Sequence, residues 1–304
     1  MLAIVSAPTN LGLRPPEPGT VPGTAKAPEA LREAGLYSRL AELGARDAGT
    51  VLPGRYVDDD ETRPSGEVRN QAALVDHARR LAERLDRVWT AGAVPLVIGG
   101  DCSLVIAAGL TDAAPEGRGL IHVDGHTDFR HPAISDECAR VAGEDLAAAI
   151  GLHWPAISDI DGRGPYFDAE RTVHIGCRDD DPNLERVRAA IGAVAPASEV
   201  ILHGGARVAA RVREVADQGA GYWLQVDVDV LDPEVMPAVD APTPGGLRAD
   251  ELVALLQGLA PRAIGASVTI FDPDLDPDGR YASLLTDVVV NGLSELGAEL
   301  GDEI

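Results

Sequence analysis

Three short segments of the chain carry side chains that bind divalent metal ions. The segments 99–103, 124–128 and 227–233 each follow a short apolar run. The first contains Asp101 and Cys102. The segment 124–128 contains two aspartates and one histidine, and the segment 227–233 contains three aspartates. Thiolate, imidazole and carboxylate groups are the usual protein ligands of divalent transition metals. The three segments therefore indicate a metal site.

The spacing within the segment 124–128 limits how its side chains can reach one ion. Residues two apart on an extended strand lie about 7 Å apart, so Asp124 and Asp128 would lie about 13 Å apart. Two ions about 3.5–4 Å apart would let Asp124, His126 and Asp128 all act as ligands. A backbone that curls at Gly125 would also let all three side chains act as metal ligands.

Asp227 and Asp229 would add two carboxylates from another strand. Four like charges in one cleft repel each other strongly unless a cation lies among them. We therefore predict a carboxylate-rich site for two metal ions. Taken singly, each acidic segment has the alternative interpretation of a helix N-cap, and His126 that of a structural histidine.

The elements that would position these side chains follow an α/β pattern. Short apolar runs bounded by Gly, Pro or Asp alternate with Ala-, Leu- and Arg-rich stretches of helical spacing, which favours a mainly parallel sheet with helices on both faces. The expected strands cover 2–6, 94–98, 120–123, 172–175, 222–226 and 264–270. The expected helices cover 27–43, 67–90, 184–191, 206–217, 250–259 and 281–300. Ligands of such sheets bind beyond the carboxyl ends of the strands, where the three segments lie.

Composition and charge narrow the class of protein. We find no linker composition and no repeat, so we expect a single α/β domain over residues 1–304. The net charge of −23 argues against a nucleic-acid or anionic-membrane surface and suits cationic substrates or metal ions. Three widely spaced cysteines favour a reducing cytoplasm over a disulfide framework. The N-terminus is typical of a first strand rather than a signal peptide, and no apolar stretch is long enough to span a membrane.

The motifs resemble those of the arginase/agmatinase (ureohydrolase) family over nearly the whole chain. The segment 99–103 (GGDCS) is similar to that family's GGDHS motif, 124–128 (DGHTD) to its DAHxD motif, and 227–233 (DVDVLDP) to its DxDxxDP motif. The loop 174–182 is similar to its IGxRD loop and 244–247 to its GGL turn. The resemblance implies a three-layer α/β/α sandwich with a dinuclear manganese centre.

The resemblance also implies two sets of metal ligands that share two bridging carboxylates. The first set is Cys102, Asp124, Asp128 and Asp227. The second set is Asp124, His126, Asp227 and Asp229. A hydroxide between the two metals would attack the guanidinium carbon, and the products would be an amine and urea.

Cys102 departs from the family's pattern, which has histidine at this position. A thiolate would favour softer ions such as Zn²⁺ or Fe²⁺ over Mn²⁺ and would make the bound water less acidic. Alternatively, Cys102 stays protonated and that metal site is weak, or Cys102 is a small buried residue without a metal.

Two further departures affect catalysis and recognition. Ala142 stands where active relatives carry a histidine that shuttles protons, and Glu144 is the nearest substitute acid or else a solvated residue at a helix start. Ile270 stands where the family carries a glutamate that pairs with the guanidinium group. Asp272, Asp274 and Asp276 are alternative partners or an exposed acidic turn.

We therefore predict a metal-dependent hydrolase of linear C–N bonds that acts on a small, cationic guanidino or amidine compound. Asp128 and Glu144 are the candidate catalytic residues, and Asp181 is the candidate contact for a substrate amine. One alternative is a non-catalytic relative that keeps the fold and a single ion, and another is a hydrolase of an amide or formimino substrate. By analogy with the family, we expect a homo-oligomer.

Overall fold

The computed structural model describes residues 1–300 and forms one eight-stranded sheet in the order β2-β1-β3-β8-β7-β4-β5-β6. Every neighbouring pair of strands is parallel. The strands are β1 Leu2–Ala7, β2 Arg46–Thr50, β3 Val94–Gly99, β4 Gly119–Val123, β5 Thr172–Ile175, β6 Ala193–Ala195, β7 Tyr222–Asp227 and β8 Ala263–Thr269. The predicted α/β class with a parallel sheet is therefore confirmed.

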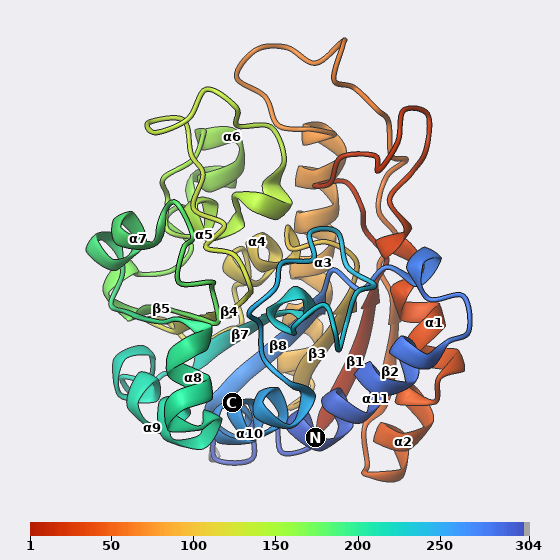
Figure 1. Cartoon of the computed structure of the whole chain (residues 1–304), viewed down its shortest axis with the longest axis vertical. Helices are drawn as coiled ribbons and strands as arrows, with labels where there is room; N and C mark the ends of the chain where they lie inside the picture. The colour runs from red at the N-terminus through yellow and green to blue at the C-terminus, as the bar shows by residue number, and fades with distance from the viewer. Residues whose placement is uncertain (301–304) are drawn as a thin grey trace.

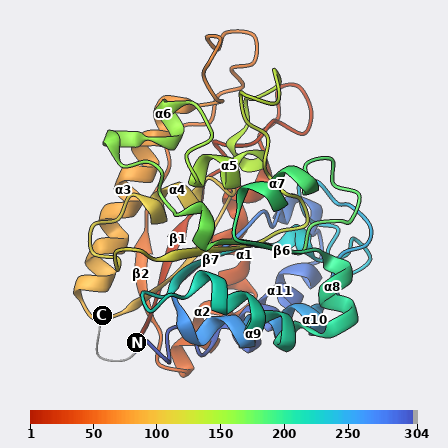
Figure 2. The same ribbon diagram turned by 90° about the vertical axis from the view of Figure 1, so that its left-hand side faces the viewer.

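Two layers of helices cover the sheet, so the predicted three-layer sandwich is confirmed as well (Figures 1 and 2). The helices of one layer, which contact one another, are α3 Gln71–Thr90, α4 Leu104–Gly109, α5 Asp145–Ala149 and α6 Pro155–Ser158. The helices of the other layer are α1 Ala27–Glu33, α2 Leu36–Glu42, α8 Ala197–His203, α9 Gly205–Ala216, α10 Ala249–Leu259 and α11 Arg280–Leu293. The remaining helix, α7 Leu184–Ala190, contacts β6.

The six predicted strands are all present, and the differences have local physical causes. Both edge strands were missed: β2, with the sequence Arg-Asp-Ala-Gly-Thr, is polar and largely exposed, and β6 has only three residues. The predicted helix 27–43 is two helices, because Gly35 between them adopts a φ of 89°. The predicted helix 281–300 ends at Leu293. Among residues 1–300, no helix combines the length and apolar character that crossing a membrane requires.

The core strands are buried on both faces, which explains their continuous apolar sequences. Strands β3, β8, β7, β4 and β5 are consecutive neighbours in the sheet. The segments after β3, β4 and β7 therefore leave the same edge of the sheet side by side. This arrangement brings together the three segments that the sequence marks as metal-binding.

Gly100 allows the loop after β1 to pack against the loop after β3. A Cβ atom on Gly100 would overlap the backbone carbonyl of Thr9. The same two loops are joined by Asp101, whose Oδ2 accepts hydrogen bonds from Gly12 N–H (3.1 Å) and Thr9 Oγ1 (3.2 Å). The position of the loop that carries Cys102 thus depends on a residue without a side chain.

We expect Gly100→Ala to destabilise the protein by about 3 kcal/mol or more, because a backbone atom cannot move aside for the added methyl group. Gly143→Ala is the matched control, since its Cβ would lie 3.6 Å from the nearest atom, in Arg140. We expect that control to cost less than about 1 kcal/mol. Urea unfolding of both variants measures the difference, and equal midpoints would contradict this account of the loop packing.

Candidate metal centre

A tight turn brings two carboxylates together at the end of β7. The strand ends at Asp227 and is followed by the 3₁₀ turn Val228–Val230. One Asp227 oxygen accepts a hydrogen bond from the Asp229 backbone N–H (2.8 Å) and so caps this turn. Both side chains are buried at the same edge of the sheet. The capping interpretation therefore holds for Asp227, but it occupies only one of its two oxygens.

The segment 124–128 is curled rather than extended. Asp124 Oδ1 accepts a hydrogen bond from His126 N–H (2.6 Å), and Asp128 has a left-handed φ of 44°. Gly125 lies against the Asp229 backbone, where a Cβ atom would not fit. The chain thus adopts the curled arrangement, which was one of the two solutions that the spacing left open.

The curl and the turn gather the predicted ligands into three neighbouring groups. Within each group, the potential ligand atoms all lie within 4.8 Å of one another. The groups are Cys102, Asp124 and Asp227; Asp124, His126 and Asp229; and His122, Asp128 and Asp145. Five of the six predicted ligands thus fall into the first two groups, which share Asp124. Asp128 instead meets His122 and Asp145, two residues that the sequence did not single out.

Burial and mutual repulsion dominate the electrostatics of these aspartates. Burial, followed by the charges of neighbouring carboxylates, raises the pKa values of Asp124, Asp128 and Asp227 well above their usual range. Asp229 behaves differently: burial raises its pKa, but the hydrogen bond and charge of His126 outweigh this and lower it. Burial lowers the pKa of His126, yet its Nδ1, 2.9 Å from Asp229 Oδ2, brings the value up to about 9.

These residues fit a divalent cation. Asp124 Oδ2 and Asp145 Oδ1 are buried and have no hydrogen-bond partner, although buried polar atoms normally have one. A cation would supply the missing interaction and would offset the repulsion between the carboxylates. Carboxylate and imidazole groups at such short separations are a donor set that Mn²⁺ and related ions accept.

Cys102 lies at the base of the first group. Its Sγ donates a hydrogen bond to Asp227 Oδ2 (2.9 Å) and lies 3.1 Å from Thr269 Oγ1. Burial and then the charge of Asp227 raise the pKa of the thiol well above its usual range. In the absence of a cation, Cys102 is therefore a neutral hydrogen-bond donor.

The buried guanidinium of Arg178 holds the backbone around this centre. It donates hydrogen bonds to the carbonyls of Asp229 (3.0 Å), Leu231 (3.3 Å) and Thr243. Its side chain comes from the loop after β5, so it connects that loop to the turn that carries Asp227 and Asp229. The IGxRD-like and DxDxxDP-like motifs are in this way physically joined.

A cavity of about 210 Å³ opens directly above the centre. His126, Asp128, Asp227 and Asp229 form part of its wall, and so does Ile270. The charged residues Arg130, Arg140, Asp181 and Asp240 also line it. The cavity can therefore bring a small polar molecule against the candidate metal ligands.

Asp181 lies in the cavity wall, but its carboxylate already has several partners. It accepts hydrogen bonds from Thr127 N–H (3.0 Å), Thr127 Oγ1 (2.8 Å) and Asn183 N–H (2.8 Å). These contacts fix the curled segment next to Asp128. A substrate contact for Asp181 stays a prediction, and its visible role is to position the loop.

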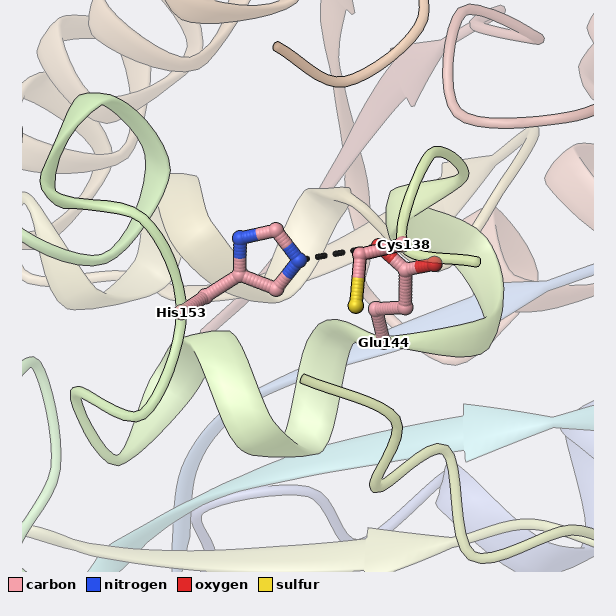
Figure 3. A group of neighbouring side chains, drawn as sticks. All are labelled: Cys138, Glu144 and His153. Atoms are coloured by element: carbon pink, nitrogen blue, oxygen red, sulfur yellow. Dashed lines mark hydrogen bonds and ion pairs between the residues drawn. The ribbon is translucent and has the colours of Figure 1, made fainter. Parts of the chain in front are cut away.

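Glu144 is not among the residues that line the cavity. Its side chain lies beside those of His153 and Cys138 (Figure 3). Its carboxylate is buried and accepts hydrogen bonds from the backbone N–H groups of Ala139 (2.9 Å) and Arg140 (3.2 Å). His153 Nε2 contacts the other oxygen at 2.9 Å, and Cys138 lies alongside. Ala142 forms the cavity wall at this point. The visible role of Glu144 is to hold this loop, and its role in proton transfer stays a prediction.

Three residues near the centre were not predicted from the sequence. His122 could have been found, because it precedes Asp124 by two residues on a strand and so shares its face. Asp145 begins α5, where an acidic residue is ordinarily explained as helix stabilisation. Asp240 follows no strand, and only the folded chain places it in the cavity wall, 3.6 Å from Arg140.

The parallel α/β sandwich, with buried carboxylates at the carboxyl ends of its central strands, has the fold of solved ureohydrolase structures. The chain belongs to the arginase family, since the model of that family matches residues 2–294. The family suggested by the sequence motifs is thereby confirmed. Homologues in this family are metal-dependent amidinohydrolases, and the prediction of an enzyme of that class is confirmed at this level.

Individual relatives support this assignment over most of the chain. Arginase from Bacillus caldovelox is 31% identical over 291 residues, which cover 93% of this chain and 94% of that protein. Human arginase-1 is 30% identical over 246 residues, which cover 75% of this chain and 73% of that protein. The solved structure of the B. caldovelox arginase superposes with a TM-score of 0.83 at 27% identity, covering 100% of this chain and 99% of that one. Proclavaminate amidino hydrolase from Streptomyces clavuligerus gives a TM-score of 0.70 at 26% identity, with coverages of 98% and 92%.

We expect Arg178→Met to destabilise the protein by about 3 kcal/mol or more, because several buried carbonyls would lose their donor. Arg186→Met is the control, since Arg186 is exposed and donates one hydrogen bond to Asn183. That change should cost less than about 0.5 kcal/mol. Unfolding of both variants in guanidinium chloride tests this prediction. A small decrease in the free energy of unfolding of Arg178→Met would show that the turn does not depend on Arg178.

The raised pKa values of Asp124, Asp128 and Asp227 make the stability of the metal-free protein depend on pH. Each group keeps its proton longer in the folded chain, so its stabilising effect is complete below the unfolded pKa of about 4 and is lost as pH rises through the folded value. We expect the free energy of unfolding of the chelator-treated protein to fall as the pH rises above about 6.5, where imidazoles with lowered pKa values no longer oppose the effect.

The comparison with Asp124→Asn isolates this effect. The variant removes one of the interacting charges, so its stability should fall less over the same range. Buried imidazoles with lowered pKa values, such as those of His122 and His174, act in the opposite direction only below about pH 6.5. Identical pH slopes for the two proteins would refute the assignment of the effect to the carboxylate cluster.

Proposed function

We propose that the protein hydrolyses a linear C–N bond of a small guanidino or amidine compound and releases urea. The observation that carries this proposal is the set of ligand groups around Asp124, which lies beneath a cavity of about 210 Å³. Membership of the arginase family and the likeness to an amidino hydrolase support the same reaction class.

We further propose a centre of two divalent ions, with manganese as the expected metal and zinc or iron as alternatives because of Cys102. Asp124, His126, Asp227 and Asp229 are the ligands that the close groups support most directly. Bound ions would lower the pKa of a water molecule and so provide a nucleophile near neutral pH.

The protein's own residues would orient the substrate and handle protons. Asp128 lines the cavity beside the centre and is the candidate acceptor for a proton released during hydrolysis. The carboxylates in the wall favour a cationic substrate, and Asp240 is the candidate partner for its planar group. Arg140, 3.6 Å from Asp240, would hold that carboxylate in place. Self-association and a cytoplasmic location stay predictions.

Ile270 favours a second candidate function. Its apolar side chain lies in the cavity wall and cannot pair with a guanidinium ion. A hydrolase of an amide or formimino compound would not need a carboxylate at that point. The two candidates share the metal centre and differ only in the group that the cavity recognises.

Turnover of a panel of substrates tests the proposal, with the protein loaded with Mn²⁺ and separately with Zn²⁺. The panel contains arginine, N-hydroxyarginine, agmatine, guanidinobutyrate and formiminoglutamate, and the readout is release of urea or ammonia. We expect turnover of at least one compound and a loss of more than about 100-fold in Asp227→Asn, which removes a ligand charge from the centre.

The control variant is Asp287→Asn, an exposed aspartate on α11 that pairs with Arg39. It should keep the full rate. Unchanged turnover in Asp227→Asn would show that the reaction does not use the centre. A protein that retains two ions and turns over no member of the panel would favour the non-catalytic alternative.

A further inference from the structure

A histidine on β4 lies beside the proposed metal centre, and neither the sequence motifs nor the comparisons assign it a role. His122 is the fourth residue of β4, and Asp124 follows it two positions later on the same face. Its ligand atom lies within 4.8 Å of those of Asp128 and Asp145. The three residues come from a strand, a loop and the first turn of α5.

The contacts of the His122 ring give its two nitrogens different surroundings. Nδ1 lies 3.0 Å from Nδ1 of His174, on the paired position of β5. Nε2 lies 3.2 Å from Asp145 Oδ2 and 3.7 Å from Asp124 Oδ2. Without a cation, Nε2–H can donate to Asp145 Oδ2, whereas a cation at Nε2 would take the place of that proton and leave Nδ1–H to donate to His174. A metal-binding histidine typically has this arrangement, with the other ring N–H held by a neighbour.

Two unpartnered carboxylate oxygens are further evidence for a cation-binding site at this point. Asp145 Oδ1 and Asp124 Oδ2 are both buried without a hydrogen-bond partner, and both residues are fully buried. Leaving a buried charged oxygen without a partner costs at least about 1–3 kcal/mol. A cation bound by His122, Asp128 and Asp145 would have the Asp145 carboxylate as a ligand, and Asp124 Oδ2 lies 3.7 Å from His122 Nε2.

Cys102, by contrast, has its hydrogen bonds satisfied without a metal. Its thiol donates to Asp227 Oδ2 at 2.9 Å, and Thr269 Oγ1 lies 3.1 Å away. A thiol must lose its proton to ligate a metal, and here the proton is shared with a carboxylate. Deprotonation at this point would also add a further negative charge to the buried aspartates.

We propose that His122, Asp128 and Asp145 hold one of the two metal ions, while Cys102 remains a thiol that positions Asp227. The inference rests on the proposed function, because it assigns ligands within the same metal centre. The imidazole that Cys102 replaces in the GGDHS-like motif is thus supplied from β4. A donor set of one nitrogen and several oxygens suits Mn²⁺ better than a thiolate set does.

Cobalt substitution tests this assignment without relying on activity. The full-length protein is loaded with Co²⁺, and its near-ultraviolet absorption is recorded together with its metal content. We expect two ions and no sulfur-to-cobalt charge-transfer band. His122→Asn and Asp145→Asn should each bind one of the two ions at least about tenfold more weakly. Cys102→Ser keeps the donor to Asp227 and should retain both ions, and circular dichroism checks that each variant is folded.

A charge-transfer band in the unmodified protein that disappears in Cys102→Ser would overturn the proposal. This test does not depend on whether His122→Asn folds. Loss of an ion in Cys102→Ser, or two tightly bound ions in both His122→Asn and Asp145→Asn, would also overturn it. Turnover measured on the same samples separates the two proposals. Activity together with a thiolate band contradicts this inference alone, two ions without turnover contradict the proposed function alone, and no bound ion contradicts both.

Discussion

Asp124, Asp227 and Asp229 are buried side by side where β4 and β7 end, and the repulsion between their charges is the constraint that the surrounding structure has to meet. Backbone N–H groups and a thiol offset part of this repulsion. His126 N–H donates a hydrogen bond to Asp124, and Asp229 N–H donates one to Asp227. Cys102 donates to the other Asp227 oxygen. Arg178 adds a buried positive charge that holds the same turn from behind. Because Asp124 Oδ2 still has no partner, the protein alone does not satisfy the cluster completely.

The sheet makes this concentration of charge possible. Five consecutive parallel strands end at one edge of the sheet. Loops that are far apart in the sequence therefore begin close together in space. The strands themselves are held by a continuous apolar core, and the unfavourable charges are confined to the first residues beyond them. The apolar part of each strand thus stabilises the fold, and the acidic residues just beyond its carboxyl end form the candidate metal centre.

The sequence predicted the features that depend on local patterns and missed those that depend on long-range placement. The central strands were predictable because burial on both faces requires continuous apolar runs, whereas β2 is polar and resembles a loop. The ligands within the motifs 124–128 and 227–233 were predictable from residue type and spacing. Asp145 and Asp240 carry no such signal, since only tertiary contacts bring them to the centre. Glu144 was selected for its position beside Ala142, but its hydrogen bonds turn it into the loop.

The two departures at Cys102 and Ile270 are neighbours in space. Ile270 N–H donates to the carbonyl of Gly100 at 2.7 Å, and the Cys102 sulfur touches Thr269, the residue before Ile270. Ile270 itself has a left-handed φ of 71°, which is rare for a β-branched residue and is maintained by this connection between the loops. An exchange at either position therefore alters the setting of the other. A larger side chain at position 102 would displace Thr269 and so shift the backbone of Ile270 in the cavity wall.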